Sequence, residues 1–222
     1  MSDTEIIERI AARGDGVTAS GRHVVRGVPG DMVAADGTLT PGPHHATPPC
    51  RHFPKCGGCQ LQHADEAALR QFVTDRVVHA ARAQDIAVDE VLPTHLSPPG
   101  SRRRAMLHAL RTAQGAVLGF REGGSHRIVD MRECHILVPE LIALVEPLRA
   151  LVAAHGERQA VDIELTLADQ GVDCTVKGIA AEGLAATEAM LDFARDHSLA
   201  RLSLDRGYGP ETVWEPAPLT VT

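Results

Sequence analysis

The chain has few aromatic residues and no long apolar run. Only 3% of its 222 residues are Phe, Trp or Tyr. A protein that holds single-stranded nucleic acid by stacking bases on aromatic rings is therefore not expected. No stretch approaches the roughly 20 apolar residues that span a bilayer, and the acidic start, residues 1–5, lacks a signal-peptide pattern. We therefore expect a cytoplasmic protein with no membrane partner.

A general excess of basic residues is also missing. The formal net charge is −7, whereas binding to nucleic acid through its phosphates requires Lys and Arg. The arginines are unevenly placed, however, because Arg102, Arg103 and Arg104 are consecutive and Arg121 follows soon after. A local basic surface can exist on an acidic molecule. The alternative interpretation of this run is a solvated strand edge.

The cysteines are too unevenly spaced for a disulfide framework. Five cysteines is an odd number, and Cys50, Cys56 and Cys59 are clustered while Cys134 lies far downstream. Clustered thiolates suit a metal better than disulfides in a reducing compartment. We expect the two glycines between Cys56 and Cys59 to let the backbone turn sharply so that the sulfurs converge. The spacing predicts an iron–sulfur cluster or a structural zinc closed by Cys134.

Spacing alone leaves the bound group open between these two. Structural zinc sites commonly use two C-x-x-C hairpins, and the second hairpin is missing here, which favours an iron–sulfur cluster. A redox disulfide between Cys56 and Cys59 fits the flanking sequence poorly. Four histidines near the loop could serve zinc, although we expect each to be solvated: His44, His45, His52 and His63.

Cys174 differs from the other four cysteines. It alternates with Val172 and Val176 in a predicted strand, which places the three side chains on one face. A nucleophilic cysteine would need a base beside it, and the sequence offers none. We therefore predict that Cys174 is a small buried apolar residue.

The first half of the chain reads as a small β-rich segment followed by a helix. Short strands are expected near residues 24–25 and 32–34, between Gly- and Pro-containing turns. Gly14 and Gly16 are interpreted as turn residues, since no strand–helix context supports a dinucleotide-binding loop. Apolar residues recur at helical spacing over residues 65–84, where Asp65 is a candidate N-cap.

The second half alternates strands and helices. Gln114-Gly115 is a plausible hairpin turn between the first two strands, and Pro147 is expected to kink the first helix. The pattern predicts an α+β domain with a largely antiparallel sheet. The expected strands are residues 103–110, 116–121, 127–130, 161–167, 172–177, 200–205 and 211–214, and the expected helices are residues 139–155 and 184–197.

The cysteine motif and its surroundings resemble a known family. Cys50-x5-Cys56-Gly-Gly-Cys59-Gln-Leu-Gln-His63 before a helix, with Cys134 downstream, resembles the iron–sulfur branch of the RNA uracil-5-methyltransferases. Residues 11–33 resemble a shortened TRAM-type (OB-type) β-barrel, and residues 102–105 resemble the arginine-rich strand of the central domain. The resemblance covers nearly the whole chain, and its cysteine motif is highly specific.

The resemblance implies a cofactor and a partner. It implies a 4Fe–4S cluster on Cys50, Cys56, Cys59 and Cys134, and a structured ribosomal or transfer RNA, not DNA, as the partner. It also indicates that the arginine run contacts that RNA, and the four arginines assigned to this role are Arg102, Arg103, Arg104 and Arg121. Intact members use S-adenosylmethionine, and a cysteine attacks C6 of a flipped uracil to activate C5.

The resemblance also divides the chain. We expect a shortened TRAM-like segment at residues 1–40, the cluster loop and helix at 41–90, a central α+β RNA-engaging domain at 91–206, and the start of a methyltransferase domain at 207–222. No glycine-rich cofactor loop and no catalytic cysteine are recognised, so whether this chain alone is an enzyme is left open. The alternatives are a zinc-stabilised protein-binding module without a catalytic role and a free-standing iron–sulfur regulator.

Overall fold

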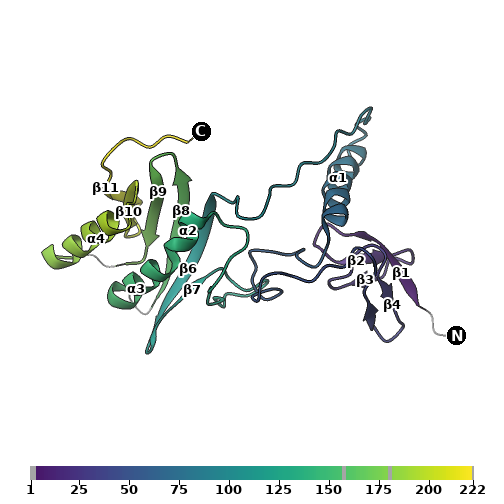
Figure 1. Ribbon diagram of the computed structural model, residues 1–222, viewed down its shortest axis with the longest axis horizontal. Coiled ribbons are helices and arrows are strands. Elements are labelled where there is room, and N and C mark those ends of the chain that lie inside the picture. Colours follow the sequence, from purple (N-terminus) through teal and green to yellow (C-terminus); the bar gives the residue numbers. More distant parts are fainter. Residues whose placement is uncertain (1–3, 157–158, 180–181, 222) are drawn as a thin grey trace. The chain divides into compact units, whose positions relative to one another are not determined.

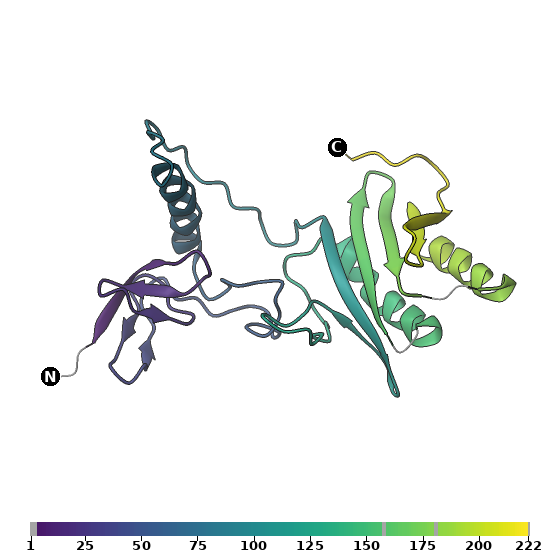
Figure 2. The same cartoon turned by 180° about the vertical axis from the view of Figure 1, so that it is seen from behind.

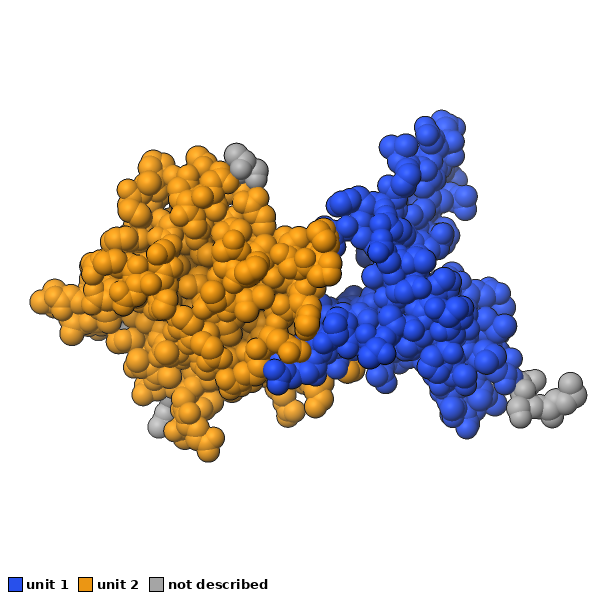
Figure 3. Space-filling model, in the orientation of Figure 1, with its two compact units in different colours: residues 1–53, 59–97 blue, residues 54–58, 98–222 orange. Residues whose placement is uncertain are grey.

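The chain folds into two compact units (Figure 3). The computed structural model describes residues 4–156, 159–179 and 182–221. Unit 1 comprises residues 1–53 and 59–97, and unit 2 comprises residues 54–58 and 98–222. Each unit has its own β-sheet, and the expected α+β class with mainly antiparallel sheets is confirmed. In the described part of the chain, no helix is both long enough and apolar enough to cross a membrane.

Unit 1 is built on a curled, antiparallel five-stranded sheet in the order β3-β2-β1-β4-β5. Strand β1 lies at its centre, with Ile7 opposite Thr18 of β2 and Ile6 opposite Met32 of β4. This arrangement is compatible with the small OB-type barrel expected from the sequence. The strands are β1 (Glu5–Ile10), β2 (Gly16–Thr18), β3 (His23–Val24), β4 (Met32–Val33) and β5 (Leu39–Thr40).

A buried carboxylate organises the turns of unit 1. The Asp31 side chain is fully buried. Its oxygens accept hydrogen bonds from the backbone N–H of Val28 at 3.0 Å and of Gly42 at 2.7 Å, and Oδ2 lies 2.8 Å from Nδ1 of His45. A carboxylate without water needs such donors, so Asp31 fixes the turn before β4 to the segment that follows β5.

The helix α1 (Glu66–Arg82) of unit 1 begins where the sequence predicted. Asp65 is its N-cap, and its Oδ1 accepts a hydrogen bond from the backbone N–H of Ala68 at 2.8 Å. Such a bond satisfies one of the free N–H groups in the first turn. Ala68 is also the one residue of α1 that is fully buried, where it packs with Ile10 and Val28.

Unit 2 contains a six-stranded sheet in the order β11-β10-β9-β8-β6-β7. All neighbours are antiparallel except β9 and β10, which are parallel and are connected through α4 (Leu184–Asp196). A parallel pair requires such a crossover. The strands are β6 (Arg104–Thr112), β7 (Gly115–Gly119), β8 (Ala160–Ala168), β9 (Gly171–Lys177), β10 (Arg201–Asp205) and β11 (Pro210–Trp214).

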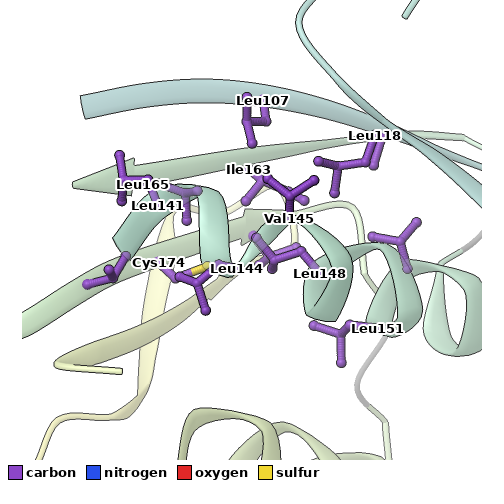
Figure 4. Packing of buried hydrophobic residues seen from close by; sticks show 14 of the residues in the cluster. Leu107, Leu118, Leu141, Leu144, Val145, Leu148, Leu151, Ile163, Leu165 and Cys174 are labelled. Atoms are coloured by element: carbon purple, nitrogen blue, oxygen red, sulfur yellow. The ribbon is translucent and has the colours of Figure 1, made fainter. Parts of the chain in front are cut away.

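The core of unit 2 lies between this sheet and its helices. Helices α2 (Pro139–Ala143) and α3 (Val145–His155) cover one face of the sheet (Figure 1), and the view from behind shows the other face without a helix (Figure 2). Alternate residues of the strands point into a single apolar cluster with α2, α3 and α4. Its fully buried members include Leu107, Leu118, Leu141, Leu148, Ile163 and Leu165 (Figure 4).

Two expected elements of unit 2 differ in detail. The helix expected over residues 139–155 is two helices separated at Leu144 and not at Pro147. Pro147 lies in the first turn of α3, where a missing N–H costs nothing. Residues 127–130 form no regular strand. They are held instead by single bonds, which run from the Glu122 N–H to the Arg127 carbonyl at 2.8 Å and from the Val129 N–H to the Phe120 carbonyl at 2.9 Å.

Candidate functional site

The four candidate metal-binding cysteines are divided between the two units. Cys50 and Cys59 belong to unit 1, whereas Cys56 and Cys134 belong to unit 2. All five cysteines lie in the described part of the chain and none is in a disulfide. Among the described residues, no group of three or more His, Cys, Asp or Glu side chains is placed to hold a metal ion.

Cys56 is attached to unit 2 by its neighbours. It forms an isolated antiparallel bridge with Glu122. On either side, the Gly57 N–H donates to the Arg121 carbonyl at 2.8 Å, and the Gly123 N–H donates to the Lys55 carbonyl at 3.1 Å. Residues 55–57 therefore run beside residues 121–123, and Cys56 packs partly buried against the core of unit 2.

The backbone turns at the two glycines after Cys56, as expected from the sequence. Neither Gly57 nor Gly58 has a φ in the left-handed region, so the turn itself does not require glycine, and the need for glycine is one of space. A Cβ on Gly57 would lie 2.7 Å from the Arg121 carbonyl oxygen, and one on Gly58 would lie 3.1 Å from the Phe120 ring. Glycine thus allows the cysteine loop to approach residues 120–123 closely.

Cys134 follows an arm that folds back on β7. The arm, residues 120–131, is closed by a bridge between Arg121 and Ile128. Immediately after Cys134, the chain is fixed by hydrogen bonds from the Gly100 N–H to the His135 carbonyl at 2.9 Å and from the Arg102 N–H to the Ile136 carbonyl at 2.8 Å. Cys134 packs partly buried against the same core as Cys56. The fold thus brings two of the four candidate cysteines to one core.

A buried arginine on α3 anchors this arm. Arg149 is 8% exposed, and its guanidinium donates to the Met131 carbonyl at 2.8 Å, to the Ala116 carbonyl at 3.3 Å and to the Asp130 carboxylate. Burial acts to raise the pKa of Asp130, but hydrogen bonds from Arg149 and from the Leu118 N–H hold that pKa below its ordinary value. The sequence reasoning missed Arg149, because nothing local marks a charged residue as buried.

Three of the four candidate RNA-binding arginines have acidic neighbours. Arg103 lies 3.8 Å from Asp169. Arg104 lies 4.0 Å from Glu164, and Arg121 lies 3.8 Å from Asp162. These arginine side chains are between 41% and 77% exposed, so the pairs are surface pairs and hold the guanidinium groups weakly. The guanidinium of Arg102 lies 5.6 Å from the centre of the Phe120 ring.

Two of these arginines belong to the face of the sheet that α2 and α3 leave uncovered. Ala105, Leu107 and Ala109 of β6 point into the core, which places Arg104, Met106 and His108 on the other face. Asp162 and Glu164 of β8 lie opposite His108 and Met106 in the register and pair with Arg121 and Arg104. The uncovered face (Figure 2) therefore carries charges of both signs.

Cys174 and three of the histidines near the loop are buried or hydrogen-bonded. Cys174 is fully buried in the core, as predicted, and burial raises the pKa of its thiol to about 12. His44 lies 2.9 Å from Asp65 and His45 contacts Asp31. The expectation of solvation is wrong for His63, which is 2% exposed. Both of its ring nitrogens are buried without a hydrogen-bond partner in the described part of the chain.

Comparison with known proteins gives the relationship of the chain. No protein-family model matches it. Over 217 residues it is 44% identical to an uncharacterized RNA methyltransferase of Zymomonas mobilis, covering 97% of this chain and 55% of the relative. The chain is related to RNA methyltransferases. It spans about half the length of the curated relatives that it matches.

Two relatives carry a more specific name. The 23S rRNA (uracil(1939)-C(5))-methyltransferase RlmD of Nitrosospira multiformis is 36% identical over 184 residues, which is 79% of this chain and 41% of the relative. The enzyme of the same name from Pectobacterium atrosepticum is 32% identical over 194 residues, which is 82% of this chain and 43% of the relative.

Proposed function

We propose that this chain is the RNA-engaging, cluster-bearing part of an S-adenosylmethionine-dependent RNA (uracil-5-)methyltransferase that acts on ribosomal or transfer RNA. The observation that carries the proposal is the 44% identity over 97% of the chain to a protein named an RNA methyltransferase. The two relatives named 23S rRNA uracil-C5 methyltransferases support ribosomal RNA as the substrate. Cofactor binding and methyl transfer are assigned to a domain outside residues 1–222.

We assign Cys50, Cys56, Cys59 and Cys134 as the ligands of a 4Fe–4S cluster. Four thiols fit such a cluster by donor chemistry, and the two that belong to unit 2 lie half-buried at one core. The close approach of Gly57 and Gly58 to residues 120–123 supports a compact loop around the bound group. Bonds to four thiolates from two distant segments stabilise a loop-rich region, and we assign the cluster this structural role.

We assign RNA binding to the arginines of unit 2. Arg102, Arg103, Arg104 and Arg121 can contact phosphates without sequence information. Because Arg103, Arg104 and Arg121 have acidic neighbours, each must exchange a weak surface pair for a phosphate. We therefore expect each of these arginines to contribute modestly to RNA binding, and we expect that binding to weaken steeply as the salt concentration rises.

Methyl transfer by the whole protein tests the proposed function. The whole protein is incubated with labelled S-adenosylmethionine and either unmodified 23S rRNA or unmodified transfer RNA, and the RNA is digested and analysed for 5-methyluridine by mass spectrometry. We expect 5-methyluridine in one of these RNA classes and none when S-adenosylmethionine is omitted. Absence of 5-methyluridine from both RNAs, with the protein folded and loaded with its cluster, would contradict the proposal.

A further inference from the structure

Helix α1 and the segment that returns from it expose an apolar groove. Six large apolar residues here are at least 37% exposed, and the groove between helix and segment has a volume of about 320 Å³. Contiguous apolar surface of this kind marks an interaction site more often than scattered single residues do. The six residues are Val73, Val77, Ile86, Val88, Val91 and Leu92.

The groove has a defined shape because the return segment is attached to the helix. Oγ1 of Thr94 lies 2.6 Å from Oγ1 of Thr74, and the Arg70 guanidinium donates to the Thr94 carbonyl. Residues 86–97 have no regular secondary structure. These side-chain contacts therefore hold Val91 and Leu92 beside the Val73–Val77 face of α1, where they line the groove.

Unit 1 gives this region little support of its own. The packing of α1 on the core of unit 1 lies in its first two turns, where Ala68 is buried and Leu69 and Phe72 are partly buried. Every residue from 82 to 93 is exposed. Helices in water are marginal without tertiary packing of an apolar face. The second half of this 17-residue helix, where Val77 is two-thirds exposed, therefore has little packing against the core of unit 1.

We propose that this groove is the docking surface for the catalytic domain of the whole protein. The inference rests on the proposed function, in which methyl transfer belongs to a domain outside residues 1–222. The relatives supply the length for such a domain, since the matched stretch is 55% of the Zymomonas mobilis protein. Glu90 lines the groove and Asp89 is its neighbour in the chain, and both are exposed. A partner face with an apolar ridge and basic side chains at its edge matches this lining.

Hydrogen–deuterium exchange tests the docking by comparing the whole protein with residues 1–222. We expect peptides covering residues 66–93 to exchange about tenfold more slowly in the whole protein, because docking suppresses local opening. Leu92→Asp in the whole protein should restore the fast exchange of the shorter chain. Val25→Asp is the matched control, since Val25 and Leu92 are both 72% exposed and Val25 lies outside the groove.

Three results would overturn the docking proposal. The first is equal exchange of residues 66–93 in both proteins, and the second is a reading frame that adds no further domain. The third is protection in residues 1–222 alone that increases with protein concentration, which would assign the groove to a second copy. Methyl transfer is measured separately. An active protein with an unprotected α1 refutes the docking alone, and a protected α1 in a protein that methylates no RNA refutes the proposed function alone.

Discussion

The two units are stabilised in different ways. Unit 2 buries one large apolar cluster between a six-stranded sheet and three helices. Unit 1 has two small clusters, and its turns depend on the buried Asp31 carboxylate. A small core buries too little apolar surface to stabilise a domain strongly on its own. Unit 1 therefore depends on polar anchors such as Asp31, and we expect the proposed cluster and the proposed domain to stabilise it further.

Removing the buried charge of unit 2 is expected to have the largest effect. Arg149→Leu leaves the buried Met131 carbonyl without its guanidinium donor. It also removes one donor from the Asp130 carboxylate, which keeps Arg132 and the Leu118 N–H. A buried polar group left without its partner costs about 1–3 kcal/mol, and the apolar contacts of the Arg149 stem are changed as well. Urea unfolding followed by Trp214 fluorescence measures this, since Trp214 is the only tryptophan and lies in unit 2.

Arg132→Leu is the matched control for that substitution. Arg132 pairs with the same carboxylate, at 2.6 Å, but its side chain is 50% exposed. Exposed pairs contribute about 0–1 kcal/mol. Equal losses in the two variants would show that burial of Arg149 is not what stabilises the arm before Cys134.

In unit 1, the corresponding experiment is Asp31→Ala. It removes the acceptor for the backbone N–H groups of Val28 and Gly42, and a buried donor left without an acceptor costs about 1–3 kcal/mol. Amide exchange of β1 and β4 should accelerate while unit 2 is unchanged. Asp36→Ala removes an exposed carboxylate that caps a turn at Thr38 and should have little effect. Faster amide exchange in unit 2 as well would contradict the view that Asp31 stabilises unit 1 alone.

Acid should destabilise unit 1 through His63. Burial lowers the pKa of His63, nearby His45 and Arg26 lower it further, and Asp31 acts in the opposite direction. Below the ordinary value of 6.5 the unfolded chain takes up a proton that folded unit 1 does not, so stability falls as the pH falls. At higher pH His63 is neutral in both the folded and the unfolded chain, so it adds no pH dependence to the stability of unit 1. His63→Gln should flatten the profile, measured by NMR of unit 1 amides in urea. An unchanged profile would contradict this role.

The smallest expected effect is on RNA binding by unit 2. Arg104→Ala should weaken binding to 23S rRNA a few-fold and reduce the slope of log K against log salt by about 0.7–1. Fluorescence anisotropy at several salt concentrations measures both. Arg195→Ala on α4, which removes another exposed, ion-paired arginine, is the control. Equal effects of the two substitutions would remove Arg104 from the interface.

Local sequence patterns predicted the features that are set by residues close together in the chain. The cap at Asp65 and the burial of Cys174 followed from spacing, because a helix start and a strand face are encoded within a few residues. The break at Leu144 could not be predicted from Pro147, because a proline in the first turn of a helix replaces an N–H that has no partner within the helix.

The candidate site was less predictable for a physical reason. Arg149 contacts Met131 and Ala116, which lie 18 and 33 residues away in the chain, and Asp31 reaches Gly42 and His45. Buried charges of this kind are set by tertiary packing and carry no local signature. The cysteine quartet was predicted from spacing and from the family resemblance and stays a prediction; within unit 2, Cys56 and Cys134 pack against one core.

Elemental analysis of anaerobically purified residues 1–222 tests the central claim most directly. We predict about four irons and four sulfides per chain with visible charge-transfer absorbance, all lost in Cys134→Ser and all retained in Cys174→Ser. A colourless protein with one zinc per chain, or a Cys134→Ser variant that keeps its iron, would contradict the account.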